Sequence, residues 1–210
     1  MQKIYLMPLL ALLLMFGCQD QSEEVIEPED SSCTSYQLEV NVRERSIEPN
    51  YFKFEINNET FGGWCINILE PMDLGLHSVN AVSSTCATTD LLQCLFPESY
   101  ENIGAINWLL NQNFDDFDAQ DMQMAIWTIM LNGEIRDNIP HLSKYSGDNS
   151  EESAFYPLYL MASENKNFVP VCGENVAILL YKDCHTAPSG LKWQTSIITE
   201  TVVCSDIETN

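Results

Sequence analysis

Positively charged side chains are scarce in this chain of 210 residues, which has 9 lysines and arginines against 31 aspartates and glutamates. With a formal net charge of −22, the sequence offers no basic patch to displace counterions from phosphates, which argues against nucleic-acid binding. There are only 3 histidines, and none has the Cys/His spacing of a zinc site. Glycine-rich phosphate loops and serine nucleophile elbows are absent as well. We therefore expect no metal ion, no cofactor and no nucleic-acid partner.

A few imidazole and acidic side chains remain as candidate ligands or catalysts. They are His77, His141, His185, Asp115, Asp116, Asp118 and Asp121. The histidines are interpreted as surface or hydrogen-bonded residues, although one of them could form a hydrolase- or transglutaminase-like site with Cys65 and an acid. The aspartates lack the spacing and the glycine of an EF-hand, so helix capping and loop solvation explain them more simply than calcium does.

A long apolar run occurs at the N-terminus, from Ile4 to Phe16. It is short for a membrane span and follows a basic start, which is typical of a signal peptide. The run ends in Met15-Phe16-Gly17-Cys18, which resembles the lipobox of bacterial lipoproteins. The resemblance implies a signal peptide at 1–17 and acyl chains, such as palmitate, on Cys18. An ordinary secretory signal with an incidental cysteine is the alternative.

Residues 18–34 are acidic, poor in apolar side chains and interrupted by Pro28, so we expect a lipidated cysteine followed by a flexible tether. An acidic, serine-containing stretch at this position resembles the surface-export signal of Bacteroidetes lipoproteins. The resemblance implies an outer-membrane lipoprotein that is exposed on the cell surface. The strongly acidic composition also favours solubility outside the cell.

Residues 35–206 are numerous enough for a single domain with a sizeable core. Apolar residues alternate with polar ones at 36–43 and 52–56, which predicts half-buried strands. Gly62 and Gly63 indicate a bulge or a close backbone approach just before Cys65, which we place on a strand. Further strands are predicted at 176–181 and 193–203.

Helical spacing of apolar residues predicts helices at 98–112 and 118–133, with a short helix at 155–163. Asp118 is the expected N-cap of the second helix, with Asp121 in its first turn and Gly133 at its end. We expect the Ser/Thr-rich stretch 76–97 to be irregular. The order of strands, helices and strands predicts an α+β fold. In it, a helical subdomain is inserted into a β-rich, barrel- or sandwich-like subdomain stapled by disulfides.

The chain has 8 cysteines, and assigning Cys18 to lipid leaves an odd number in an oxidising compartment. Six cysteines allow fifteen connectivities. The arrangement with the simplest geometry pairs Cys86 with Cys94, Cys172 with Cys184, and Cys33 with Cys204. It leaves Cys65 over as the cysteine with another role.

Two sequence motifs surround Cys65 and Gln123. Trp64-Cys65-Ile66-Asn67 has an aromatic residue directly before the cysteine, and Gln123-Met124-Ala125-Ile126-Trp127 follows it some sixty residues later. In this order, with the helix ending at Gln112 between them, they resemble the thioester domain of bacterial surface adhesins. The similarity covers roughly residues 50–205.

The resemblance implies that the side chains of Cys65 and Gln123 form an internal thioester. Such a bond forms when a thiol, held against a glutamine amide and shielded from water, displaces ammonia. Trp64 and Trp127 flank the reacting residues and are expected to shield the bond. Backbone N–H groups in the first turn of the second helix are expected to steady the oxyanion.

The expected function is therefore a single covalent capture, not enzymatic turnover. A nucleophile, such as a lysine amine, on an unidentified surface protein or glycan would take the acyl group of Gln123 and release Cys65. Adhesion is the role that the resemblance implies. The alternative is a disulfide-stabilised surface lipoprotein with a binding or structural role and no reactive bond, in which Cys65 is a buried thiol.

Overall fold

The computed structural model describes residues 33–45, 52–68, 72–113, 116–139, 142–182 and 193–204. The expected signal peptide, the expected lipidation site Cys18 and most of the expected tether lie outside these residues. Within this described part of the chain, no helix is long and apolar enough to span a bilayer. The described domain already includes Cys33, two residues before the boundary expected from the sequence.

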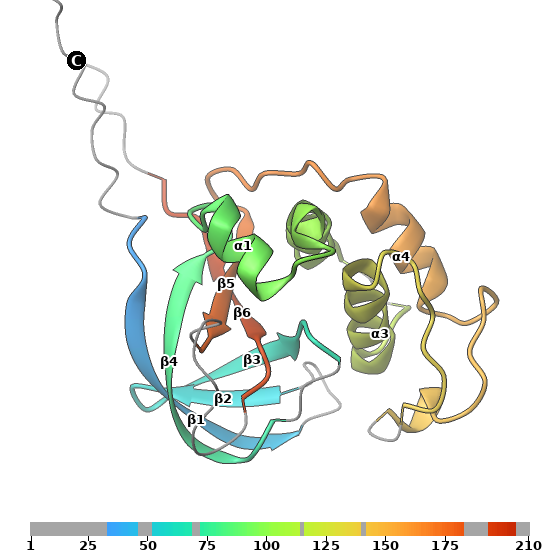
Figure 1. Cartoon of the computed structure of the whole chain (residues 1–210), viewed down its shortest axis with the longest axis horizontal. Helices are drawn as coiled ribbons and strands as arrows, with labels where there is room; N and C mark the ends of the chain where they lie inside the picture. The colour runs from blue at the N-terminus through green and yellow to red at the C-terminus, as the bar shows by residue number, and fades with distance from the viewer. Residues whose placement is uncertain are drawn as a thin grey trace, which may run out of the picture. The chain divides into compact units, whose positions relative to one another are not determined.

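Six antiparallel strands close into a barrel, in the order β1-β2-β3-β6-β5-β4 (Figure 1). The strands are β1 (Tyr36–Arg45), β2 (Phe52–Ile56), β3 (Glu59–Cys65), β4 (Gly75–Ser83), β5 (Asn175–Tyr181) and β6 (Ser196–Thr201). The β-rich part of the fold is thus a barrel, which is one of the two architectures expected. β3 lies beside β6, far from it in sequence, so the barrel closes between the N-terminal and C-terminal parts of the domain.

The β2–β3 hairpin shows how local sequence sets the register of the barrel. Asn57 and Asn58 both have positive φ angles, 53° and 67°, as a two-residue type I′ turn requires. This turn aligns Phe52 with Gly63 and Phe54 with Phe61. Residues of β2 alternate between buried and partly exposed, so one face of the strand points into the barrel.

The interior of the barrel is packed with aromatic side chains. Trp193, just before β6, contacts the ring of Phe54 at 6.1 Å and that of His77 at 5.0 Å, between ring centroids. Its indole Nε1–H donates to the carbonyl of Leu180 at 3.1 Å. Because these partners belong to β2, β4 and β5, Trp193 fills the lumen and ties three strands together.

All four described α-helices lie in sequence between β4 and β5. They are α1 (Thr89–Leu95), α2 (Ile103–Leu110), α3 (Ala119–Met130) and α4 (Tyr156–Ser163), with short 3₁₀ turns at Tyr100–Asn102 and Ser143–Tyr145. α2 packs against β5 and α3 against β3, beside the barrel in Figure 1. The α+β class is confirmed.

The expectation of an irregular connection at 76–97 is wrong. Most of β4 and all of α1 lie there. The side chain of Thr88 caps α1 by accepting from the N–H of Leu91, and β4 is held by its pairing with β1 and β5. A Ser/Thr-rich composition is therefore compatible with regular structure where a cap and two neighbouring strands supply the hydrogen bonds.

Disulfides staple both ends of the described domain. Cys33 is bonded to Cys86, and Cys172 to Cys204. All three expected pairings are therefore wrong. Two of them were inferred from short separation in sequence and the third from the positions of Cys33 and Cys204 at the two ends of the domain, whereas strand register decides. In the β5–β6 register Asn175 faces Thr201, and extending the same register brings Cys172 opposite Cys204.

The remaining cysteines have different positions. Cys94, in α1, is disulfide-bonded, and Cys184 lies outside the described residues. Cys65 is a buried thiol. Among the described cysteines it is therefore Cys65 that retains a thiol, as the cysteine count had indicated.

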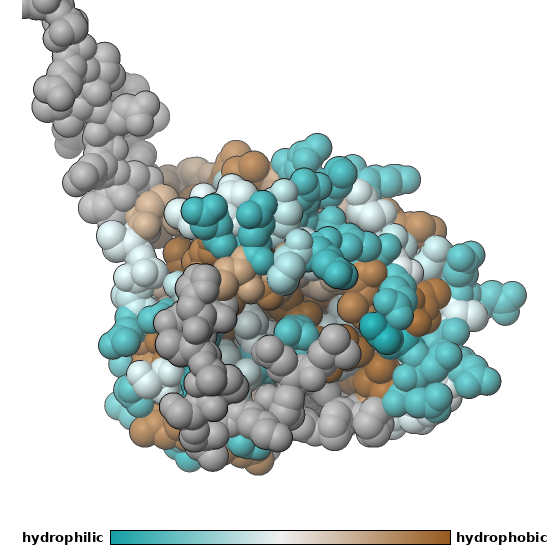
Figure 2. All heavy atoms as spheres, in the orientation of Figure 1, coloured by the Kyte–Doolittle hydropathy of each residue, from teal (hydrophilic) through white to brown (hydrophobic). Residues whose placement is uncertain are grey.

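On the face shown in Figure 2, hydrophilic side chains spread over the helical part, with smaller apolar areas between them. This distribution agrees with a chain whose formal net charge is −22.

Replacing Gly63 with alanine is expected to lower the free energy of unfolding by about 1–3 kcal/mol, because the new methyl group overpacks the barrel. An added Cβ would lie 2.3 Å from Cε2 of the buried Phe54 and 2.6 Å from the backbone oxygen of Ile197. Urea unfolding of G63A measures the loss. Gly147, whose Cβ would have no atom within 4 Å, provides the control G147A. Equal stability of the two variants would contradict the close approach at Gly63.

Candidate functional site

Cys65 is the last residue of β3, and its pairing leaves one side of its backbone open. It faces Ser196 of β6, and the next N–H, that of Ile66, donates to the carbonyl of Thr195 at 2.9 Å. Successive backbone groups of a strand point to opposite sides, so the N–H and C=O of Cys65 point away from β6. On the side away from β6, the described part of β2 begins at Phe52, which pairs with Gly63. No described residue of β2 therefore pairs with Cys65.

The carboxamide of Gln123 occupies this open side. The N–H of Cys65 donates to Gln123 Oε1 at 2.9 Å, and Gln123 Nε2 donates to the Cys65 carbonyl at 2.7 Å. Both residues are 0% exposed. The side-chain amide thus takes the place of a peptide group on a neighbouring strand and satisfies two buried backbone groups. The structure brings together the two residues that the sequence motifs singled out.

The position of Gln123 is set by the start of α3. Asp118 is the N-cap, and it forms a capping box with Asp121, so the helix start expected from the sequence is confirmed. Gln123 is the fifth residue of the helix, one turn beyond Ala119, and faces β3. Because Trp127 is four residues later, it lies on the same face as Gln123.

Two of the expected oxyanion donors in the first turn of α3 are already engaged by the N-cap. The N–H groups of Gln120 and Asp121 donate to Asp118 Oδ1 at 2.8 and 3.0 Å. The backbone N–H of Cys65 instead donates to the side-chain oxygen Oε1 of Gln123. Sequence reasoning missed this donor because it depends on how β3 meets α3, which neither motif encodes.

The thiol of Cys65 points into the barrel. A Cβ on Gly63 would meet the Phe54 ring inside the lumen, and Cys65, two residues later on the same strand, projects to the same side. Its Sγ lies 3.8 Å from Ser196 Oγ. The Ser196 hydroxyl donates to the carbonyl of Gln194 at 2.9 Å, so towards the thiol it acts as an acceptor.

Trp64 and Trp127 are both buried, at 4% exposure each. Strand alternation places Trp64 on the opposite face of β3 from the Cys65 thiol, on the outside of the barrel. Trp64 therefore covers the helix-facing side of the site and does not lie directly over the sulfur. On the inner side, the lumen is filled by Trp193, a residue that the sequence indicated only as part of a predicted strand.

A charged cluster fixes the first turn of α3, two residues before Gln123. The buried carboxylate of Asp121 accepts a hydrogen bond from the Tyr145 hydroxyl, and Lys144 Nζ lies 2.7 Å from it and 3.2 Å from Asp118. Burial works against the charge of Lys144, but hydrogen bonds to Asp121 and Asp118 raise its pKa overall. Burial also opposes the charge of Asp118, whose pKa is nevertheless lowered by the Asp121 N–H and by Lys144.

Tyr145→Phe is expected to cost about 1.5–3 kcal/mol near neutral pH, because it removes a buried hydrogen bond to a charged group. Burial, followed by the hydrogen bond to Asp121, raises the pKa of Tyr145 above its ordinary value of 10.0. As the pH rises, the Tyr145 hydroxyl therefore loses its proton in the unfolded chain before it does so in the folded protein. The stabilisation is complete below the ordinary pKa of 10.0 and is lost as the pH rises above that pKa. Urea unfolding from about pH 8 to about pH 11 should show a shallower alkaline decline for Y145F than for wild type. Parallel declines would contradict the role of Tyr145.

The other candidates give no second site. His77 is buried in the barrel, where its Nε2 lies 2.8 Å from the Asp73 carbonyl oxygen. His141, His185 and Asp115 lie outside the described residues. Within the described ranges, no group of three or more His, Cys, Asp or Glu side chains could hold a metal ion.

Comparison with known proteins adds no relative: no family model, no curated protein and no solved structure matches the chain.

Proposed function

We propose that this protein is a surface lipoprotein that captures its partner covalently, through an internal thioester between Cys65 and Gln123. The observation that carries the proposal is the double hydrogen bond that holds the Gln123 carboxamide against the main chain of Cys65, with both residues fully buried. The resemblance of the two surrounding motifs to the thioester domains of bacterial adhesins supports the same pair. The helices between β4 and β5 would then correspond to the inserted helical subdomain of that family.

The carboxamide is held against the main chain of the residue that carries the nucleophile, which keeps the two reacting side chains in the same part of the fold. In the proposed reaction, Sγ of Cys65 attacks Cδ of Gln123. The N–H of Cys65, already bound to Oε1, stabilises the oxyanion that develops on that oxygen. The C–N bond then breaks, the thiol proton is transferred to the leaving nitrogen, and ammonia departs.

Ser196 is the residue placed to orient the thiol. Its hydroxyl oxygen is 3.8 Å from Cys65 Sγ and acts as an acceptor towards it, so it can hold the S–H group in position before the sulfur attacks. The capture step restores the thiol: an amine attacks the thioester, an amide forms at Gln123, and the proton returns to Cys65. Each molecule reacts once, so the protein is not an enzyme in this proposal.

Burial protects the proposed thioester from hydrolysis. Cys65 and Gln123 are fully buried, and the flanking Trp64 and Trp127 are almost fully buried. Water is therefore kept from the thioester until a partner reaches it. The proposed location is the outer face of the outer membrane, held by acyl chains on Cys18, where a covalent bond to a surface protein or glycan would serve adhesion.

Methylamine labelling tests the proposal. A small amine should become attached to Gln123 in the purified protein, and peptide mapping by mass spectrometry should locate it there. Labelling absent from Gln123, with an alkylatable thiol at Cys65 in every denatured molecule, would exclude the thioester.

A second candidate function has a specific observation behind it. The Gln123 carboxamide satisfies both backbone groups of Cys65, which is a complete structural role without any reaction. On that basis the protein would be a disulfide-stabilised lipoprotein with a binding or structural role. The labelling experiment separates the two, because a hydrogen-bonded glutamine does not react with methylamine.

A further inference from the structure

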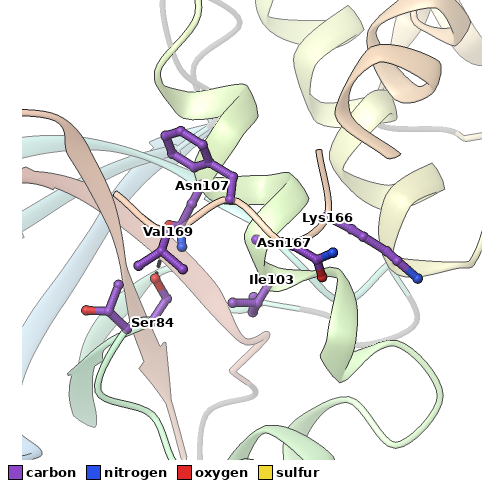
Figure 3. Close-up of a pocket in the computed structure, with 9 residues that line it drawn as sticks. Ser84, Ile103, Asn107, Lys166, Asn167 and Val169 are labelled. Atoms are coloured by element: carbon purple, nitrogen blue, oxygen red, sulfur yellow. Dashed lines mark hydrogen bonds between the residues drawn. The ribbon is translucent and has the colours of Figure 1, made fainter. Parts of the chain in front are cut away.

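A cavity of about 300 Å³ lies away from Cys65, between α2, the turn after β4 and the segment that follows α4 (Figure 3). Its lining includes Ser84, Asn107, Lys166 and Val169. The volume is at the lower end of the range of small-molecule sites and is enough for one compact ligand. Val169 is 67% exposed, so this side of the cavity opens to the surface.

Asn107 presents a fixed donor to this cavity. Its Oδ1 accepts from the Ser84 hydroxyl at 3.0 Å and from the N–H of Ala177 at 3.0 Å. Two donors at the oxygen fix the orientation of the amide, so Nδ2 points the other way, towards the cavity. Asn107 is 2% exposed, and no residue in the described ranges accepts a hydrogen bond from Nδ2. An amide N–H that faces the cavity without a described acceptor can donate to a ligand or to water.

The opposite wall adds acceptors but no charge. The chain after α4 lies directly on Gly104, where a Cβ would be 2.0 Å from the Lys166 carbonyl oxygen and 3.0 Å from that of Phe168. No described group donates to either carbonyl. The Lys166 ammonium is directed away from Asn107 and Ser84 in Figure 3. The lining therefore combines an amide donor, backbone carbonyls that pack against Gly104, and the apolar side chains of Ile103 and Val169.

We propose that this cavity binds an uncharged saccharide unit of monosaccharide size. A sugar matches the walls because it carries hydroxyl donors and acceptors around its edge and an apolar C–H face. A charged ligand would find no counter-ion among the lining side chains that point inward, and an anion would also be repelled by a chain of net charge −22. The proposal does not depend on the reactivity of Cys65.

Saturation-transfer NMR on the purified protein, with glucose, N-acetylglucosamine and glucuronic acid as probes, tests this inference. At least one neutral sugar should show saturation transfer with an affinity near millimolar, and glucuronic acid should bind about tenfold more weakly. Val169→Trp, which places an indole across the opening, should reduce neutral-sugar binding about tenfold. The matched control is Val171→Trp, at an exposed valine two residues away that does not line the cavity.

Three outcomes would overturn the proposal: saturation of neither neutral sugar, which leaves water as the occupant; equal binding of glucuronic acid; or equal loss in V169W and V171W. Thermal melting of both variants checks that they fold. Cys65→Ala should bind sugar as wild type does, so failure of the thioester and failure of the sugar site are separately visible.

Discussion

The purified wild-type protein is expected to be lighter by one ammonia molecule than its sequence and disulfides account for, and Cys65→Ala is expected to restore the missing mass completely. The deficit arises because thioester formation expels the amide nitrogen of Gln123. Alanine removes the nucleophile but leaves the backbone N–H and C=O that hold the carboxamide. Intact mass spectrometry under denaturing, non-reducing conditions measures the difference.

Ser196→Ala is the companion variant for this measurement. It keeps Cys65 and Gln123 but removes the hydroxyl that lies 3.8 Å from the sulfur. If Ser196 orients the thiol, the fraction of S196A molecules with the deficit should accumulate more slowly after synthesis. A wild-type mass with all amide nitrogens present would rule the thioester out, and a deficit that persists in C65A would assign the ammonia loss to another residue.

Gln123→Leu is expected to lower the free energy of unfolding by about 2–5 kcal/mol. Leucine has a similar volume, so little of this loss comes from a cavity. It comes from the Cys65 N–H and C=O, which become unpaired in a fully buried position at about 1–3 kcal/mol each. Gln112→Leu, at an exposed position just after the end of α2, is the matched control and should change stability by about 0.5 kcal/mol at most.

Making the same change in a Cys65→Ala background separates the two contributions of Gln123. No thioester can form there, so the loss on Q123L measures the hydrogen bonds alone. A larger loss in the wild-type background would then reflect the covalent cross-link. Urea unfolding of the four proteins supplies this cycle. A cost below about 1 kcal/mol in both backgrounds would contradict the structural role of the carboxamide.

Much of the barrel followed from sequence because its strands are half-buried. In β2 the apolar residues are Phe52, Phe54 and Ile56, and each of them faces the lumen. β4 was not predicted, because its polar residues, such as Ser78 and Asn80, belong to a Ser/Thr-rich stretch that also contains a turn. Its inward face includes His77, which is buried against Trp193. The period-two pattern is weak where an imidazole takes the place of an aliphatic side chain.

The Cys65–Gln123 pair could be predicted because two local motifs mark it, and the geometry could not. Neither motif indicates that the carboxamide binds backbone groups of Cys65, or that Ser196 is the neighbour of the sulfur. Both depend on β3 lying between β6 and α3, which is long-range pairing. The disulfides show the same limit, since the partner of Cys172 is set by the β5–β6 register.

The Cys33–Cys86 disulfide has a mechanical consequence. Tension applied to the chain ahead of the domain enters at Cys33 and passes through the sulfur–sulfur bond to Cys86, just beyond the end of β4. β1 is thereby bypassed, although it is the strand that such a load would otherwise unzip first. The covalent bond remains intact at forces that break hydrogen bonds one after another, so a protein under flow could hold its barrel closed while being pulled from that end.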